Sequence, residues 1–329
     1  MKAERRDRAE LQAPKGAPRL ARKPHPIEGA LLQTGRSGLT EKSCTSALLV
    51  LAILFSSHSA LAQQPPARSD QPPTATPSPG GDQPSSSTEA LQKATQNPVA
   101  DLISVPLQNN SNFGIGPYDR TQNVLNVQPV IPTHLTQDWN LITRIIQPIV
   151  WQPNLDANSG GTFGLGDMNP TFFFSPAHPG KIIWGAGPAF VLPTATDPAL
   201  GQGKWSIGPS FVALSQPGYW TLGVLISNVW SFAGDSDRAS VNQMLLQYFI
   251  NYNLSKGWYV TISPIITANW AASNARDVWT VPFGGGVGRI MKLGAQPVNI
   301  SAQVYANAVY PSGASPWGLR LQIAFLFPK

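Results

Sequence analysis

The sequence predicts an antiparallel, up-and-down transmembrane β-barrel of about twelve strands, and three observations lead to that prediction. Segments in which apolar and polar residues alternate recur from residue 101 to the end of the chain. Tryptophans stand near both ends of several of these segments, as they do at membrane–water interfaces. The connections between the segments alternate between long and short, which is the pattern of bacterial outer-membrane barrels.

Composition excludes two other classes of protein. Only 12% of the 329 residues are charged, while the chain has 29 glycines and 32 prolines, which argues against a helix-rich enzyme. Of the 23 Lys and Arg and the 17 Asp and Glu, ten and five lie in residues 1–62, which leaves thirteen and twelve for the remainder. The basic surplus therefore belongs to the N-terminal segment, and we expect no nucleic-acid partner.

The N-terminal segment, residues 1–62, is typical of an export signal. Lys42 precedes the short apolar run 47–55, and the small-x-small pattern Ala60-Leu-Ala62 follows it, so we expect cleavage near Ala62. A short buried helix is the alternative interpretation of the apolar run. The long stretch before it leaves the true start codon open. Cleavage near Ala62 would leave a mature chain with no cysteine and no thiolate metal site, because Cys44 precedes the apolar run.

Residues 63–100 are predicted to be a Pro- and Ser-rich linker. The stretch 63–88 has no residues that can build a core, so we expect it to be disordered and partly polyproline II. A short helix is expected within 89–100, before the barrel domain at 101–329.

The barrel prediction depends on the length and pattern of the alternating segments. In 258–270, one face carries Trp258 and Trp270 at its ends with apolar residues between them, and Pro264 excludes a helix. Twelve steps at ~3.3 Å give roughly 40 Å, which a 45° tilt projects to about 28 Å, the thickness of a bilayer core. The expected strands are 103–113, 122–132, 138–151, 168–176, 182–193, 204–215, 219–232, 242–254, 258–270, 279–291, 297–310 and 317–327.

The predicted connections sort by length in a way that a β-sandwich does not require. Five connections have five residues or fewer and are expected to be periplasmic turns: 133–137, 177–181, 216–218, 255–257 and 292–296. Six are longer and are expected to be outer loops: 114–121, 152–167, 194–203, 233–241, 271–278 and 311–316. An even number of strands then returns both chain ends to the periplasm.

Aromatic residues at the strand ends predict contact with an outer membrane. The expected interface girdle is Trp139, Trp151, Trp220, Trp230, Trp258, Trp270, Trp317 and Phe327. Outer-membrane barrels commonly end on an amphipathic strand with a terminal aromatic that the assembly machinery reads; here Pro328 and Lys329 follow Phe327. We therefore expect the assembly machinery, outer-membrane lipid and lipopolysaccharide as partners.

Strand parity predicts which side chains face the lumen. The inward polar residues are Arg144, Arg320, Gln247, Asn251, Asn253, Gln303, Asn307 and Gln322. Inward arginines can set ion selectivity or pair with acidic loop residues, and the pairing is the favoured interpretation. Six glycines are also expected to face inward, either to let strands bend or to leave room for a passage or plug: Gly185, Gly187, Gly208, Gly284, Gly286 and Gly288. Arg289 has lipid-facing parity, so it either snorkels or marks a bulge.

Three segments resemble a known bacterial family. Residues 97–110, 203–214 and 281–294 are similar to outer-membrane barrels grouped with the MetA-pathway phenol-degradation proteins, often labelled transporters or, misleadingly, neuromedin U. The resemblance implies a barrel that passes small, hydrophobic or aromatic compounds. It brings no agreed catalytic or binding residues.

The predicted function is passive passage of small solutes across the outer membrane of a Gram-negative bacterium. The alternative is a structural or adhesion-type barrel with a closed lumen, and the glycine-rich loop 154–167 could fold inward as a constriction. An enzyme is not expected, because His134 and His178 fall in predicted periplasmic turns without an obvious partner. No cofactor and no metal site are expected.

Overall fold

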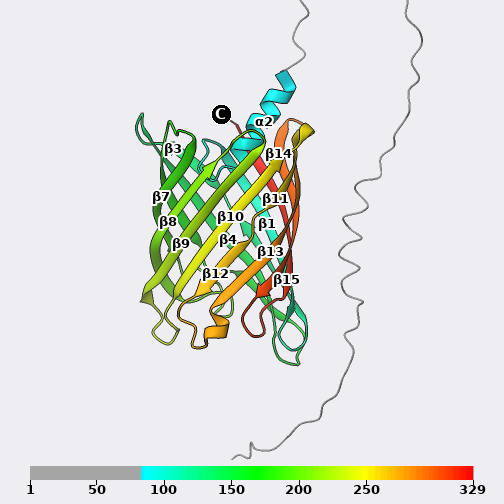
Figure 1. The fold of residues 1–329 in the computed structure, drawn as a ribbon. Helices are drawn as coiled ribbons and strands as arrows, with labels where there is room; N and C mark the ends of the chain where they lie inside the picture. The colour runs from blue at the N-terminus through cyan, green and yellow to red at the C-terminus, as the bar shows by residue number, and fades with distance from the viewer. Residues whose placement is uncertain (1–82, 329) are drawn as a thin grey trace, which may run out of the picture. The chain divides into compact units, whose positions relative to one another are not determined.

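The computed structural model describes residues 83–328, which form one short helix and a closed antiparallel barrel (Figure 1). Strands that follow one another around the barrel pair antiparallel, and β1 pairs with β15 to close the ring. The elements are α2 (Gln83–Thr95), β1 (Ile103–Ile115), β2 (Arg120–Val127), β3 (Val130–His134), β4 (Trp139–Pro153), β5 (Gly161–Leu165), β6 (Asn169–Pro176), β7 (Ile182–Val191), β8 (Lys204–Ser215), β9 (Trp220–Gly234), β10 (Asn242–Asn253), η1 (Ser255–Gly257), β11 (Trp258–Ile262), β12 (Ile265–Asn269), η2 (Ala275–Asp277), β13 (Trp279–Leu293), β14 (Gln296–Val309) and β15 (Trp317–Phe327).

Fifteen strand segments of the described chain build twelve barrel strands, because three strands are interrupted. β2 and β3 lie end to end around Pro129, which has no N–H to donate. β5 and β6 both pair with β4, with a one-residue shift of register between them. β11 and β12 both pair with β10 and are separated by Ser263 and Pro264. The predicted twelve-stranded barrel is confirmed.

The predicted strand bounds agree closely with the structure, with one correction. Segments 204–215 and 317–327 coincide with β8 and β15, and 258–270 corresponds to β11 and β12. The expected outer loop 152–167 is wrong in part, because Gly161–Leu165 forms β5 along β4. The glycines of β5 are neither clearly polar nor apolar, so the segment shows no alternation that would predict a strand. Helix α2 begins six residues before the expected 89.

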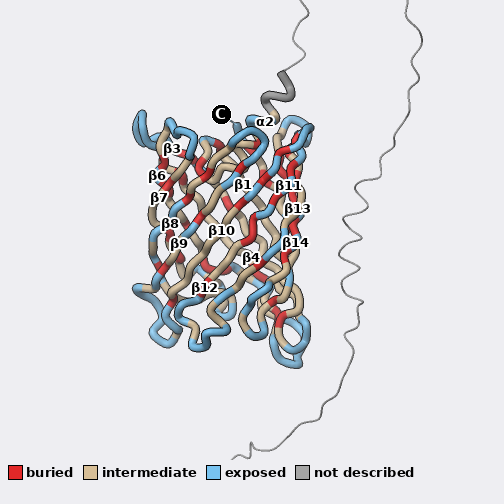
Figure 2. The backbone as a smooth tube through the Cα atoms, in the orientation of Figure 1, coloured by how far each residue is buried: buried red, intermediate tan, exposed pale blue. Residues whose placement is uncertain are grey.

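The two faces of the barrel wall differ as the alternation predicts. On β10, Ile250 and Tyr252 are each 36% exposed on the exterior, whereas Asn251 and Asn253 are 5% and 6% exposed. Figure 2 shows exposed residues along the wall and at the loops, with buried residues between them. An apolar exterior around a more polar interior is the arrangement that lipid outside and water inside require.

The aromatic residues of the predicted girdle all lie on the exterior, near the strand ends. Each is exposed by more than a third of its surface: Trp139, Trp151, Trp220, Trp230, Trp258, Trp270, Trp317 and Phe327. Several pack on other aromatic rings, as in Trp270 on Trp279, with ring centroids 5.2 Å apart. The guanidinium of Arg289 lies over the ring of Trp258 at 5.1 Å, as expected for a snorkelling arginine at an interface.

The end of the barrel that carries the short turns is called the turn end. Helix α2 lies at this end and is attached to it by hydrogen bonds (Figure 1). The buried side chain of Gln92 donates from Nε2 to the carbonyl oxygens of Leu254 and Trp258, at 3.4 and 3.0 Å. Gln216 donates from its amide to the carbonyl oxygen of Lys93 at 2.8 Å. No helix among the described residues is long and apolar enough to cross a membrane.

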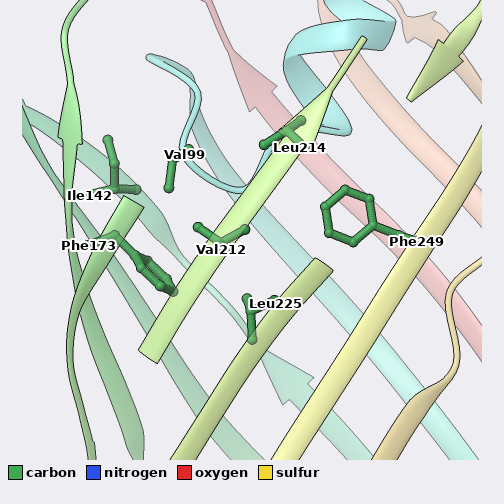
Figure 3. Close-up of a cluster of buried hydrophobic side chains, with 7 residues drawn as sticks. All are labelled: Val99, Ile142, Phe173, Val212, Leu214, Leu225 and Phe249. Atoms are coloured by element: carbon green, nitrogen blue, oxygen red, sulfur yellow. The ribbon is translucent and has the colours of Figure 1, made fainter. Parts of the chain in front are cut away.

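The chain between α2 and β1 enters the barrel. Val99 lies in a buried cluster with side chains of β4, β6, β8, β9 and β10, and Figure 3 shows it among Ile142, Phe173, Val212 and the other members. Leu102 belongs to a second cluster with Tyr259, Ile290 and Leu326. The segment 96–102 therefore occupies the lumen at the turn end, a role that periodicity could not predict.

The close approach of β13 and β14 leads to a first prediction, which tests the fold. A Cβ at Gly286 would lie 1.9 Å from the carbonyl oxygen of Ala302 on β14. We expect Gly286→Val to destabilise the barrel by about 1–3 kcal/mol, because the side chain would overpack the strand pair. Urea unfolding in lipid vesicles, followed by tryptophan fluorescence, measures this change.

Gly180→Val is the matched control for that variant. A Cβ at Gly180 in the turn after β6 would meet nothing within 4 Å. An unfolding midpoint for Gly286→Val equal to that of Gly180→Val would contradict the close packing of β13 on β14.

Candidate functional site

Several cavities lie inside the lumen, and two of them, which we call chambers, share lining residues. The chamber nearer the long loops, the loop-end chamber, has a volume of about 660 Å³ and reaches Asp277 and Ser312. The turn-end chamber, about 210 Å³, is bounded on one side by residues 94–98. Arg144 and Leu225 line both chambers, so they lie where the two meet.

Arg144 projects from β4 into this junction. Its Nη2 donates to Oε1 of Gln128 at 2.9 Å. Gln128 lies between β2 and β3, where its backbone N–H donates to the carbonyl oxygen of Pro106. No other described residue accepts a hydrogen bond from this guanidinium, so most of its N–H groups stay available on the lumen side.

Arg320 projects from β15 into the turn-end chamber and is held by neutral groups. Its Nε donates to Oδ1 of Asn110 at 3.2 Å, and its Nη1 donates to the carbonyl oxygen of Ser263 at 3.0 Å. The guanidinium lies 4.9 Å from the ring centroid of Tyr305, whose hydroxyl donates to Gln303 at 2.5 Å. The carbonyl of Ser263 is available because the interruption between β11 and β12 turns it away from β-ladder pairing.

Neither arginine has the acidic partner that the sequence favoured. Among the described residues, every hydrogen-bond acceptor for Arg144 and Arg320 is a side-chain amide or a backbone carbonyl. Within residues 83–328, the ion pair found is His134 with Asp101, at 3.3 Å and at the rim. The preference for acidic pairing is contradicted, and both positive charges face the lumen without a carboxylate.

Of the other polar residues predicted to face the lumen, some line the turn-end chamber and others lie outside it. Four line the turn-end chamber: Gln247, Asn251, Gln303 and Gln322. The side chain of Asn253 accepts a hydrogen bond from Gln96, the residue after α2, at 2.7 Å. Asn307 donates from its amide to the carbonyl oxygen of Ser315 at 2.7 Å, at the loop end of β14.

The six predicted lumen glycines have two structural settings. A Cβ would meet the backbone of a neighbouring strand at Gly187, Gly208, Gly284 and Gly286. At Gly185 it would meet Val99 of the N-terminal segment at 3.1 Å, and at Gly288 it would strike the ring of Tyr259. Neither chamber is lined by these glycines; two of them make room for side chains that fill the turn end.

A different loop from the expected one folds over the lumen at the loop end. Of the expected loop 154–167, residues 155–160 are exposed and Gly161–Leu165 pairs with β4, whereas residues 199–202 line a cavity of the lumen. The buried carboxylate of Asp167 accepts from the backbone N–H groups of Ala195 and Gln202, at 3.2 and 2.6 Å. Arg238 donates to the carbonyl oxygens of Pro198, Gly201 and Gln202. These contacts hold segment 192–203 against the wall.

The two histidines of the described residues, His134 and His178, line neither chamber. His134 contacts Asp101 and, through Nδ1, Oδ1 of Asn140 at 2.8 Å, which corrects the expectation that it lacks a partner. None of the hydrogen bonds in the described part of the chain joins it to a serine or threonine. His178 is exposed in the turn after β6. No group of three or more metal-ligating side chains occurs among the described residues.

Sequence reasoning missed several residues that organise the site. Gln128, Asn110 and Ser263 hold the two arginines, and Asp167 and Arg238 hold the inward loop. Asn110 lies in the least regular segment, and Ser263 is in a strand interruption. Asp167 was hidden by its position at the end of a predicted loop. Parity alone could have found Tyr305, which lies two residues from Gln303.

Fold and lumen together define a transmembrane β-barrel. No protein-family model matches the sequence, and no curated protein matches it either. Among solved structures, the chain is similar to the COG4313 outer membrane channel from Pseudomonas putida F1, with 18% identity and a TM-score of 0.54. That alignment covers 69% of this chain and 94% of the other, so it shows a shared fold.

Two further solved structures are more distant. The CymD monoaromatic hydrocarbon channel is 10% identical with a TM-score of 0.39, covering 72% of this chain and 92% of that one. The outer membrane phospholipase A from Escherichia coli is 13% identical with a TM-score of 0.37, covering 70% and 93%. These scores are too low to support an inference about this chain.

The hydrogen bonds from Arg238 to segment 192–203 lead to a second prediction. Arg238→Ala removes the donor to three carbonyl oxygens of this segment. We expect amide hydrogen exchange in residues 199–202 to accelerate at least about tenfold, because hydrogen bonds from a charged group each contribute about 1.5–3 kcal/mol.

Arg276→Ala serves as the control, since Arg276 is an exposed arginine of another long loop. Amide exchange in residues 199–202 that is as slow in Arg238→Ala as in Arg276→Ala would show that Arg238 does not hold this segment.

Proposed function

We propose that the protein is an outer-membrane channel for passive passage of small solutes. The observation that carries the proposal is the pair of chambers that meet at Arg144 inside a closed barrel. A barrel that served only as an anchor would not need an open lumen. It would also not need two arginines there without an acidic partner. Twelve strands give a narrower lumen than a general porin, which suits selective passage.

The predicted export signal, the apolar exterior and the alternation of loops support an outer-membrane location. In that setting, lipid and lipopolysaccharide contact the exterior, and the assembly machinery inserts the barrel. The similar Pseudomonas putida structure is described as an outer membrane channel, which agrees with the proposal. The family resemblance in the sequence suggests solutes with a hydrophobic or aromatic part, and Leu225 and Phe249 offer such solutes apolar contacts in the turn-end chamber.

One observation favours the second candidate, a structural barrel with a closed lumen. Val99 and Leu102 pack inside the turn end, so the passage is narrowed there. The two candidates differ in conductance. Purified protein in planar bilayers conducts discrete ion currents if it is a channel; a folded barrel without current or solute flux is structural.

The attachment of α2 generates the third prediction. Gln92→Ala removes the two hydrogen bonds from its amide to Leu254 and Trp258. We expect more frequent openings or a higher single-channel conductance, because the N-terminal segment is held less firmly at the turn end.

Glu89→Ala provides the comparison, because Glu89 is exposed on the same helix. Equal conductance and opening frequency in the Gln92→Ala and Glu89→Ala proteins would argue that α2 does not restrict the passage.

A further inference from the structure

We propose that the turn-end chamber binds a small organic anion, a carboxylate on a compact apolar body, through Arg144 and Arg320. This inference rests on the proposed function and specifies the class of solute that the channel selects. Both guanidiniums line the same chamber of about 210 Å³. At the volume of water in the liquid, such a space holds about seven water molecules, enough for a small organic molecule to replace them.

The charge of this chamber is uncompensated. Among the described residues that line it, two are arginines and none is an aspartate or glutamate. The remaining polar lining consists of amides and hydroxyls, such as Gln247, Asn251 and Thr261, which carry no charge. Placing a positive group away from bulk water is unfavourable unless an anion or good acceptors accompany it. An incoming anion would supply the missing negative charge.

The two guanidiniums also retain hydrogen-bonding capacity. Arg144 uses one nitrogen, for Gln128, and Arg320 uses Nε and Nη1, for Asn110, Ser263 and Gln303. Each guanidinium has five N–H groups, so both keep donors that no described residue accepts. The contacts that exist fix the direction of each side chain. Arginine held in this way is suited to a carboxylate, which accepts two parallel hydrogen bonds from one guanidinium.

The walls favour a ligand that is apolar away from its charge. Leu225, Phe249 and Val130 line the same chamber as the arginines. Leu225 and Phe249 are only 5% and 6% exposed, so the surface that they present to the chamber is small, but it is apolar and suits an apolar body better than a purely inorganic anion. Because Arg144 also borders the loop-end chamber, it is the first of the two charges that a solute arriving from the loops meets.

Equilibrium binding tests the site without depending on transport. Folded, detergent-solubilised full-length protein is titrated calorimetrically with benzoate, benzamide and benzamidinium, which share one planar shape and carry charges of −1, 0 and +1. We expect benzoate to bind at least about tenfold more tightly than the other two, because one charge-assisted hydrogen bond is worth that factor or more. Arg144→Gln and Arg320→Gln should each lower benzoate affinity about tenfold.

Two sets of variants control for charge and folding. Lys181→Gln removes one positive charge from an exposed turn and should leave benzoate affinity unchanged. Arg144→Lys and Arg320→Lys keep the charge and should retain part of the preference for benzoate. Arg144 makes a single hydrogen bond, to Gln128, so Arg144→Gln should fold even if Arg320→Gln does not; migration in unheated gels checks folding.

Three results would overturn the inference: equal affinity for the three probes, no binding of benzoate, or benzoate affinity unaffected by Arg144→Gln. Bilayer recordings distinguish failure of the anion site from failure of the channel proposal. A protein that conducts ions without preferring benzoate is a channel lacking the anion site. A protein that binds benzoate through the arginines and carries no current has the site and is not a channel.

Discussion

The whole structure depends on the pairing of backbone N–H and C=O groups around a closed ring. In hydrocarbon, an unpaired backbone group costs several kcal/mol, so a sheet can span a membrane only if its first and last strands pair. Here β1 and β15 pair from Ile103 opposite Phe327 to Phe113 opposite Trp317. Closure leaves side chains only two directions, toward lipid or toward the lumen. The interruption at Ser263 and Pro264 is tolerated because the carbonyl of Ser263 accepts a hydrogen bond from Arg320 in the lumen, and the buried Pro264 has no N–H to leave unpaired.

The interior follows from that separation. Side chains that face the lumen can be polar because they bond one another, as Tyr259 does with Asn299 at 2.8 Å and Arg320 with Asn110. The two arginines are neutralised by no carboxylate, so they give the centre of the barrel a positive character. Segment 96–102 closes part of the turn end, and segment 192–203 narrows the loop end. The part of the lumen between these two segments therefore determines which solutes can pass.

Sequence alone determined the wall of this barrel better than its interior. Alternation located β8 and β15 to the residue, because lipid requires an apolar side chain at every second position. It failed for β5, whose glycines carry no polarity signal, and for the course of residues 96–102. Parity placed Arg144 and Arg320 in the lumen, but not their partners. Those depend on register between strands, as for Asn110 opposite Arg320, which one strand's pattern does not contain. The expected signal peptide lies outside the described residues.

The most direct test of the central claim compares neighbouring residues of one strand in a lipid bilayer. Spin labels at Ile250 and Asn251 of β10, introduced as single cysteines with Cys44→Ser, report whether oxygen from lipid or a water-soluble nickel chelate reaches each position. A barrel with an apolar exterior and a hydrated lumen predicts that oxygen relaxes the label at 250 and the chelate relaxes the label at 251. Equal access of both reagents at the two positions would contradict it.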